Sequence, residues 1–341
     1  MQQGRKRTWA RRAASVVVLV AVVGGTWAGM NATALKAKYA AHKLASAPDA
    51  DKPRWADALL TYGEPGVAKL LGFVRAGEPA ATAALARHLD ALSESDPAAV
   101  ALCGQVLDAF GSCSEGGKAA VLELMPAMMP RVAASHPAKC REVVAAGLAS
   151  PAPAARLAAV RMAMHPRIKM RGDLVPLLSA PEPEIRRAAL FAVGPATDGD
   201  AVIGDEDLFR WLHDPDADVR KGCYDSLVSR GRTDPEISLG RRLANPDPAE
   251  RLKLLLDLRY DDDVPDPEPW LERLSRDAEP AVRAGATRVA VEIAADRRLP
   301  VPVWVGRIAD IDPDATVRRV AGFFRSLPTQ PAGGVRPAGG P

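Results

Sequence analysis

The chain has 341 residues, with 45 lysines and arginines against 42 aspartates and glutamates, and a formal net charge of +3. Five of the basic residues precede position 13, and without them the balance is 40 basic to 42 acidic residues. Because a nucleic-acid-binding surface must neutralise phosphates, this balance argues against a nucleic-acid partner. Aromatic residues make up only 5% of the chain, which favours thin layers of Ala, Leu and Val over one thick globular core.

The N-terminus combines a basic head, residues 1–12, with an uncharged run, residues 13–35. The run meets the length of about 20 apolar residues that a membrane-spanning helix needs. It also holds glycines at the spacing found in membrane helices. We therefore predict a transmembrane signal anchor. The alternative is a signal peptide cut near Ala32-Thr33-Ala34, which has the small-x-small form of a cleavage site and would release a secreted or periplasmic protein.

Charge on the two sides of this run predicts its orientation. Five basic residues precede it, and Lys36, Lys38 and Lys43 follow it. The more basic flank tends to stay in the cytoplasm. We expect a single-pass protein of the cell (inner) membrane, with a cytoplasmic N-terminus and the rest of the chain outside the cytoplasm. The margin is small and leaves the opposite topology open.

Residues 36–52 are interpreted as a juxtamembrane linker, and residues 53–139 as a helical segment. The helical segment has an apolar stripe at Val100, Cys103 and Leu107. We interpret it as degenerate or capping repeats, since terminal repeats are usually atypical, with a separate helical bundle as the alternative. Its helix starts are acidic residues followed by proline: Glu64-Pro65, Glu78-Pro79 and Asp96-Pro97.

Residues 140–327 carry one short phrase six times. A capping or small residue comes first, usually followed by Pro, and an Arg stands six positions after the first residue. The steps between these arginines, 30 to 35 residues, are typical of stacked helical repeats. Each phrase predicts the N-cap and first turn of the second helix of a pair. The phrases are Ser150…Arg156, Ala180…Arg186, Asp214…Arg220, Asn245…Arg251, Asp277…Arg283 and Asp312…Arg318.

Small residues, four alanines and one cysteine, stand at the third position after five of the six arginines of the phrase, where they let neighbouring helices approach closely. One helix pair cannot bury its apolar face alone, so successive pairs must stack. The sequence therefore predicts an all-α fold. The positions are Ala159, Ala189, Cys223, Leu254, Ala286 and Ala321.

The phrase Asp-Pro-x-x-x-Val-Arg followed by an Ala-rich helix resembles the HEAT-repeat family, specifically the bacterial HEAT-like repeats of the phycobilisome-lyase type. The resemblance implies an α-solenoid of stacked antiparallel helix pairs (HEAT/armadillo-like). It also implies a structural ladder in which the capping Asp joins the Arg six residues later: Asp214 with Arg220, Asp277 with Arg283, and Asp312 with Arg318. The remaining phrases keep the arginine and lack the aspartate: Arg156, Arg186 and Arg251.

Residues with catalytic or ligand-binding chemistry are few and scattered. The four cysteines form no C-x-x-C motif. Cys103 and Cys223 are interpreted as small core residues, and Cys113 with Cys140 is the pair to test for a disulfide. The five histidines form no metal or catalytic motif. We therefore expect no catalytic, cofactor-binding or metal-binding residues.

These patterns favour a non-enzymatic, membrane-anchored scaffold that binds an unidentified protein of the cell envelope. The alternative is a lyase-type or chaperone enzyme, by analogy to the phycobilisome lyases. Residues 328–341 contain Pro-Ala-Gly-Gly twice and are predicted to be a disordered tail.

Overall fold

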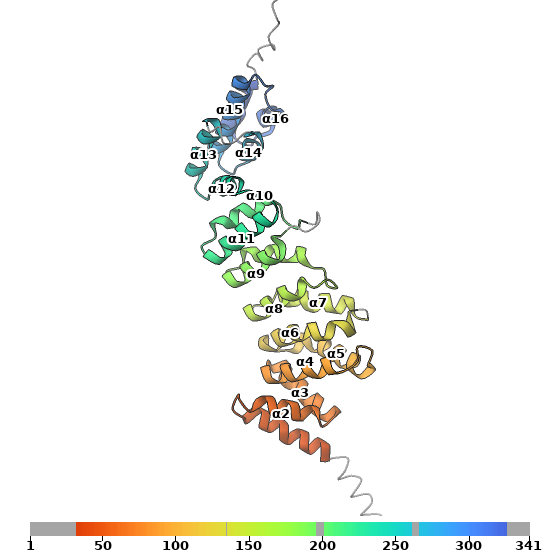
Figure 1. The fold of residues 1–341 in the computed structure, drawn as a ribbon. Coiled ribbons are helices and arrows are strands. Elements are labelled where there is room, and N and C mark those ends of the chain that lie inside the picture. The colour runs from red at the N-terminus through yellow and green to blue at the C-terminus, as the bar shows by residue number, and fades with distance from the viewer. Residues whose placement is uncertain (1–31, 134, 196–200, 261–265, 326–341) are drawn as a thin grey trace, which may run out of the picture. The chain divides into compact units, whose positions relative to one another are not determined.

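The computed structural model describes residues 32–133, 135–195, 201–260 and 266–325. Within these ranges the regular secondary structure is helical, and successive helices pack in repeat-like pairs (Figure 1). The predicted all-α fold is thereby confirmed for this part of the chain. The chain divides into two compact units, Met1–Val193 and Gly194–Pro341, which we call the N-terminal and C-terminal units.

The predicted transmembrane segment, residues 13–35, falls mainly on residues outside the described ranges, as do the basic head and the tail at 328–341. Among the helices that are described, none has the length and apolar character to span a bilayer.

The N-terminal unit is built from two rows of helices. One row is α2, α4, α6, α8 and α9, each packed on the next, and the other row is α3, α5, α7 and η2, which lean on the first (Figure 1). The same alternation thus runs through the described residues 53–133 and 135–193. The bounds are α2 Lys52–Leu60, α3 Glu64–Ala76, α4 Pro79–Ala91, α5 Pro97–Ala109, η1 Phe110–Ser112, α6 Glu115–Val132, α7 Pro137–Leu148, α8 Pro153–Ala163, η2 Arg171–Ser179 and α9 Pro183–Val193.

Residues 32–46, most of which the sequence assigned to a linker at 36–52, are helical instead. The helix buries Ala37, Ala40 and Leu44 almost completely. These three positions are three and four residues apart, so they form one apolar face of a helix. Because two of them are alanines, the stripe is weak in the sequence, yet it is enough to fold this segment onto the N-terminal unit.

The C-terminal unit repeats the pairing of short first helices with longer second helices. The second helices α13, α15 and α17 pack in series, and α14 and α16 pack on α15 and α17. A core of leucines, valines and alanines lies between the two rows, together with Trp304. The bounds are α10 Asp205–Leu208, η3 Phe209–His213, α11 Ala217–Ser229, α12 Asp234–Leu243, α13 Pro248–Tyr260, α14 Glu268–Leu274, α15 Pro280–Arg297, α16 Val303–Ile311 and α17 Ala315–Arg325.

The division between the units lies at Val193 and Gly194, inside the segment 140–327 that the sequence treats as one array. Helix α9 ends there, just before Pro195. A proline disfavours helical backbone in the residue before it, so the chain leaves the helix at this point.

The second helices begin two residues later than the sequence predicts. Asp214 was expected to be the N-cap of α11, but the N-cap is Asp216, whose carboxylate accepts hydrogen bonds from the second and third backbone N–H groups of the helix, both at 3.0 Å. Asp214 Oδ1 instead accepts from the N–H of Asp216 at 2.9 Å. The phrase is therefore a turn in which an aspartate bonds to its own backbone, and Pro215 lies within that turn.

Gly117 allows α6 to cross α3 with almost no space between their backbones. A Cβ atom at this position would lie 1.9 Å from the carbonyl oxygen of Arg75. The same carbonyl accepts hydrogen bonds from the N–H and the Oγ of Ser114, the N-cap of α6. The crossing therefore depends on the missing side chain of Gly117.

We predict that Gly117→Ala lowers the free energy of unfolding by about 1–3 kcal/mol, because the backbone of α3 has to move away. Gly104→Ala is the matched control, since Gly104 is in α5 and no atom lies within 4 Å of its added Cβ. This control should raise stability by up to about 1 kcal/mol. Urea denaturation measures both, and equal stability of the two variants would contradict the close crossing.

Candidate binding site

Each arginine of the repeated phrase is the fourth residue of its helix. In five of the six phrases the guanidinium reaches back from there to the turn that precedes the helix, whereas Arg156 binds Glu182 instead. In Arg283, Nη1 donates to the carbonyl oxygens of Asp277 at 2.8 Å and Ala278 at 3.0 Å. The arginine thus holds the turn of its own repeat closed. Carbonyls at the same two positions bind Nη1 of Arg186, Arg220, Arg251 and Arg318.

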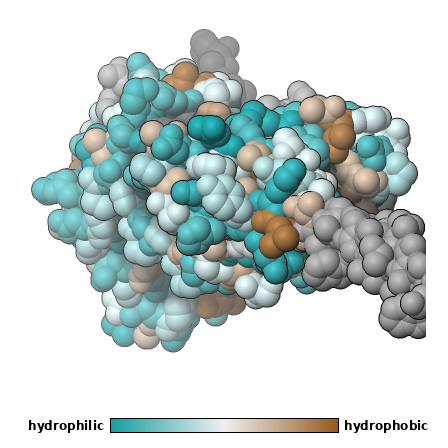
Figure 2. Space-filling model, turned by 90° about the horizontal axis from the view of Figure 1, so that it is seen from below, coloured by the Kyte–Doolittle hydropathy of each residue, from teal (hydrophilic) through white to brown (hydrophobic). Residues whose placement is uncertain are grey.

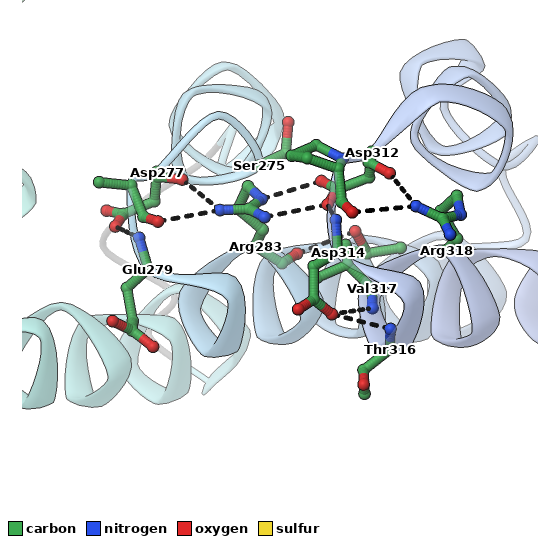
Figure 3. Close-up of polar contacts among 12 residues, drawn as sticks. Ser275, Asp277, Glu279, Arg283, Asp312, Asp314, Thr316, Val317 and Arg318 are labelled. Atoms are coloured by element: carbon green, nitrogen blue, oxygen red, sulfur yellow. Dashed lines mark hydrogen bonds and ion pairs between the residues drawn. The ribbon is translucent and has the colours of Figure 1, made fainter.

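The other side of the guanidinium binds the next repeat. Nε and Nη2 of Arg283 donate to the two carboxylate oxygens of Asp312 at 2.8 and 2.9 Å (Figure 3). Arg251 forms the same bidentate pair with Asp277, at 2.7 and 2.8 Å. A planar guanidinium matches a carboxylate in this geometry, so each pair fixes orientation as well as distance.

The carboxylate partner differs from the one that the family resemblance implies. Within one phrase the arginine bonds to the carbonyl of the aspartate, and the carboxylate comes from the following phrase. Among the described residues Arg220 and Arg318 therefore have only carbonyl partners in the ladder. The phrase after Arg220 begins with Asn245, which has no charge to offer.

A glutamate replaces the missing aspartate in the N-terminal unit. The phrase Ala180…Arg186 has no acidic first residue, yet Arg156 of the preceding repeat binds Glu182 Oε1 at 2.6 Å. The longer side chain reaches the guanidinium from two positions further along the chain. Arg186 itself holds the carbonyls of Ala180 and Pro181.

The pair Arg283–Asp312 is buried. The two side chains are 9% and 4% exposed. The hydrogen bonds from Arg283 hold the pKa of the Asp312 carboxyl below its ordinary value, against the opposing effect of burial. Asp312 also accepts from the N–H of Asp314 at 2.8 Å. The carboxylate is therefore charged and satisfied on both oxygens.

We predict that Arg283→Ala lowers the free energy of unfolding by about 3 kcal/mol, because it leaves the Asp312 carboxylate buried without its partner. Arg283→Lys should recover only part of the loss, since an ammonium cannot form the bidentate pair. Arg325→Ala, which breaks the exposed pair with Asp310, should change stability by less than about 1 kcal/mol. Thermal and urea unfolding test this, and equal effects at 283 and 325 would refute the ladder as a structural tie.

A pH dependence follows from the lowered pKa of Asp312. A carboxyl with a lowered folded-state pKa stabilises the protein above its unfolded pKa, and this contribution is lost as pH falls through the folded pKa. Asp312→Asn should therefore lose less stability than the wild type between about pH 5 and pH 2. The nearby exposed Asp310→Asn is the control and should keep the wild-type slope. Identical slopes in all three proteins would contradict the assignment.

A cleft of about 360 Å³ opens beside the last ladder pair in the C-terminal unit. Arg283 and Asp312 lie on its lining, and helix α16 supplies an apolar wall of Trp304, Ile308 and Ile311. Ile311 is 77% exposed, and Trp304 is buried. The indole N–H of Trp304 has no hydrogen-bond partner among the described residues.

Charge on the lining of the cleft is balanced. Its three arginines face three carboxylates, and Glu272 accepts a hydrogen bond from Arg276 at 2.5 Å and lies 3.6 Å from Arg307. Because these charges neutralise one another, the cleft does not select for an anion. Its chemistry suits an apolar side chain whose own backbone meets the polar rim.

The cysteines and histidines are kept apart in the structure. All four cysteines are free and buried, including Cys113 and Cys140, so the disulfide between these two is not formed. Burial raises the pKa of the Cys103 thiol to about 11 and that of Cys223 to about 12. Both thiols are therefore protonated at neutral pH. Over the described residues no three His, Cys, Asp or Glu side chains gather as a metal site.

The histidines that form hydrogen bonds do so at the ends of helices. His213 Nε2 lies 2.6 Å from the carbonyl oxygen of Arg241 and joins η3 to α12. Nδ1 of His165 accepts from the N–H of Arg167 at 3.3 Å. A third contact joins His136 Nδ1 to the hydroxyl of the adjacent Ser135 at 2.8 Å, at the start of α7.

Two arginines outside the repeated phrase have buried side chains that form structural contacts, and the sequence pattern did not predict them. Arg131 donates to carbonyl oxygens at the end of α4, including that of Leu92 at 2.7 Å. Arg230 binds Asp205 at 2.7 Å and the carbonyl of Ile203 at 2.8 Å. Each stands at the C-terminal end of its helix, where a basic residue is expected. Position alone marks neither as different from the exposed arginines at other helix ends.

Comparison with protein-family models and with curated proteins identifies no relative of this chain. No protein-family model matches it, and no curated protein matches it. The likeness to HEAT repeats therefore rests on the repeated phrase, and the function has to be argued from the geometry.

Proposed function

We propose that this protein is a membrane-anchored, HEAT-like repeat scaffold that binds another protein of the cell envelope and carries out no chemistry itself. The observation that carries the proposal is the open cleft of about 360 Å³, with an apolar wall, seated directly on a buried arginine–aspartate pair. A cleft whose base is fixed by a buried ion pair keeps its shape, and a preformed surface of this kind suits a protein that binds a partner.

The α-solenoid interpretation is supported by the period of the phrase and by the ladder. Five of the six arginines, which recur every 30 to 35 residues, hold their own turn, and Arg251 and Arg283 also bind the carboxylate of the next repeat. In such an array each repeat contacts its neighbours, and the stack offers an extended binding surface. This is the basis for a HEAT/armadillo-like assignment.

The partner that suits the cleft is a polypeptide segment with an apolar anchor residue. Ile308, Ile311 and Trp304 would cover that residue, and Arg276 and Arg307 could donate to a backbone carbonyl of the same segment. The lining contains neither His nor Cys, and we therefore prefer the scaffold to the lyase-type or chaperone enzyme.

The membrane assignment rests on the uncharged run at residues 13–35 and on the basic head before it. Under this proposal the helical array lies outside the cytoplasm and its N-terminus inside. If the run is instead a cleaved signal, the mature protein begins near Leu35 and is secreted or periplasmic.

The experiment places a photo-crosslinking amino acid at Ile311 or at Val303 in the full-length protein, in its native membranes. Both positions are exposed and lie on α16, but only Ile311 lines the cleft. We expect one discrete adduct from position 311, its loss in Ile308→Asp, and no adduct from position 303. Adducts of equal yield at both positions, or an adduct that Ile308→Asp leaves unchanged, would exclude the cleft.

Membrane attachment is tested in the same preparation. The full-length protein should sediment with membranes and resist carbonate extraction, because a spanning helix is not released by high pH. A soluble species that begins near Leu35 would instead establish cleavage of a signal peptide.

A further inference from the structure

The helix at residues 32–46 carries two large apolar side chains that stay exposed among the described residues. Leu35 is 63% exposed and Tyr39 is 57% exposed. They are four residues apart and so lie one above the other on the helix, on the side away from the buried Ala37 and Leu44. The helix therefore exposes two large apolar side chains on one side and buries Ala37, Ala40 and Leu44 on the other.

Aromatic and basic side chains surround these two residues. Tyr39 meets Trp55 of α2 edge to face, with ring centroids 5.9 Å apart. Lys43 Nζ lies 5.7 Å from the centroid of Tyr39, and the guanidinium of Arg54 lies 5.6 Å from that of Trp55. We call this set the aromatic–basic face; its members are Leu35, Lys36, Lys38, Tyr39, Lys43, Arg54 and Trp55.

The aromatic–basic face has a net positive charge. No aspartate or glutamate precedes Asp49 in the chain. In the segment that follows, Asp49 pairs with Lys52 at 2.9 Å and Asp57 pairs with Arg87 at 2.7 Å, and Asp51 alone cannot offset the four basic residues of the face. Figure 2 views the molecule from the side where α2 lies in Figure 1, and its hydrophobic residues form small separate groups in a hydrophilic surface.

The position of the aromatic–basic face along the chain indicates that it lies next to the membrane. The uncharged run at 13–35 ends within the first turn of the helix. A helix rises about 1.5 Å per residue, so Tyr39 lies about 6 Å beyond the last residue of the run. The headgroup layer on each side of a bilayer is roughly 5–8 Å thick. Tyrosine and tryptophan favour that layer, and lysines beside it are attracted to anionic lipids.

We propose that the aromatic–basic face lies on the membrane surface and binds anionic lipid headgroups, so that the N-terminal unit rests against the bilayer. The inference builds on the proposed membrane anchor and adds a second contact to it. The cation–π contacts favour this role, since each aromatic ring has beside it a positive charge that could bind a headgroup phosphate.

The test uses the full-length protein in nanodiscs with an environment-sensitive fluorophore on a single added cysteine. His42→Cys puts the label on the exposed side of the helix and leaves the aromatic–basic face intact. Phe191→Cys is the control, because Phe191 is 72% exposed on α9, the last helix of the same unit. The four native cysteines are buried and will react slowly.

In discs of phosphatidylcholine with phosphatidylglycerol, the label at position 42 should shift to the blue and be quenched by a lipid-borne quencher. The label at position 191 should do neither. Discs of phosphatidylcholine alone, or the double variant Lys38→Glu, Arg54→Glu, should lose most of the quenching at position 42. Circular dichroism establishes that the variant is folded.

The two proposals fail in different ways. Release of the whole chain from the discs would overturn the anchor and, with it, the lipid contact. Retention of the chain in the discs with an unquenched label at position 42, or with quenching that neither lipid charge nor the double variant alters, would overturn the lipid contact alone.

Discussion

The described structure depends on a guanidinium that is shared between two repeats. One edge of Arg283 closes the turn of its own repeat through two carbonyls, and the other edge grips the carboxylate of Asp312. To bind the turn carbonyls and the carboxylate at the same time, a side chain needs a planar group with donors on several sides, which lysine lacks. The aspartate also accepts a hydrogen bond from the backbone of its own turn. The arginine and this turn together therefore fix the position of one repeat relative to the next, in addition to the apolar contacts between their helices. The same arginine–aspartate pair forms part of the lining of the cleft beside α16.

Periodicity explains why so much of the fold could be read from the sequence. The arginine was expected in the first turn of each second helix and stands at its fourth residue. The start of the helix was misplaced by two residues, because an aspartate before a proline signals an N-cap and an aspartate turn equally well. Asp214 and Asp216 compete for that role, and only the backbone geometry decides between them.

Partners and cavities lie beyond what spacing can predict. The family resemblance implied a pair between Asp312 and Arg318 within one phrase, whereas the carboxylate faces the arginine of the preceding repeat, Arg283. Which neighbour a side chain meets depends on how the repeats stack, and a spacing along one chain carries no record of that. Glu182 reaches Arg156 from a position outside the pattern for the same reason. The cleft depends on how far α14 stands from α16, which no single residue encodes.

The ladder is interrupted between α11 and α13, and this has a consequence for how the C-terminal unit comes apart. At that junction Arg220 faces a phrase that begins with asparagine, while the two following junctions each have a bidentate pair. Stability in a stacked array is roughly a sum of repeat and junction contributions, so the array divides where a junction is weakest. The helices α13 to α17 therefore behave as one cooperative block, and opening begins at its edge. The cleft is lined by α14, α15 and α16, away from that edge, and the partner that we propose would contact helices that stay folded when the neighbouring repeat opens.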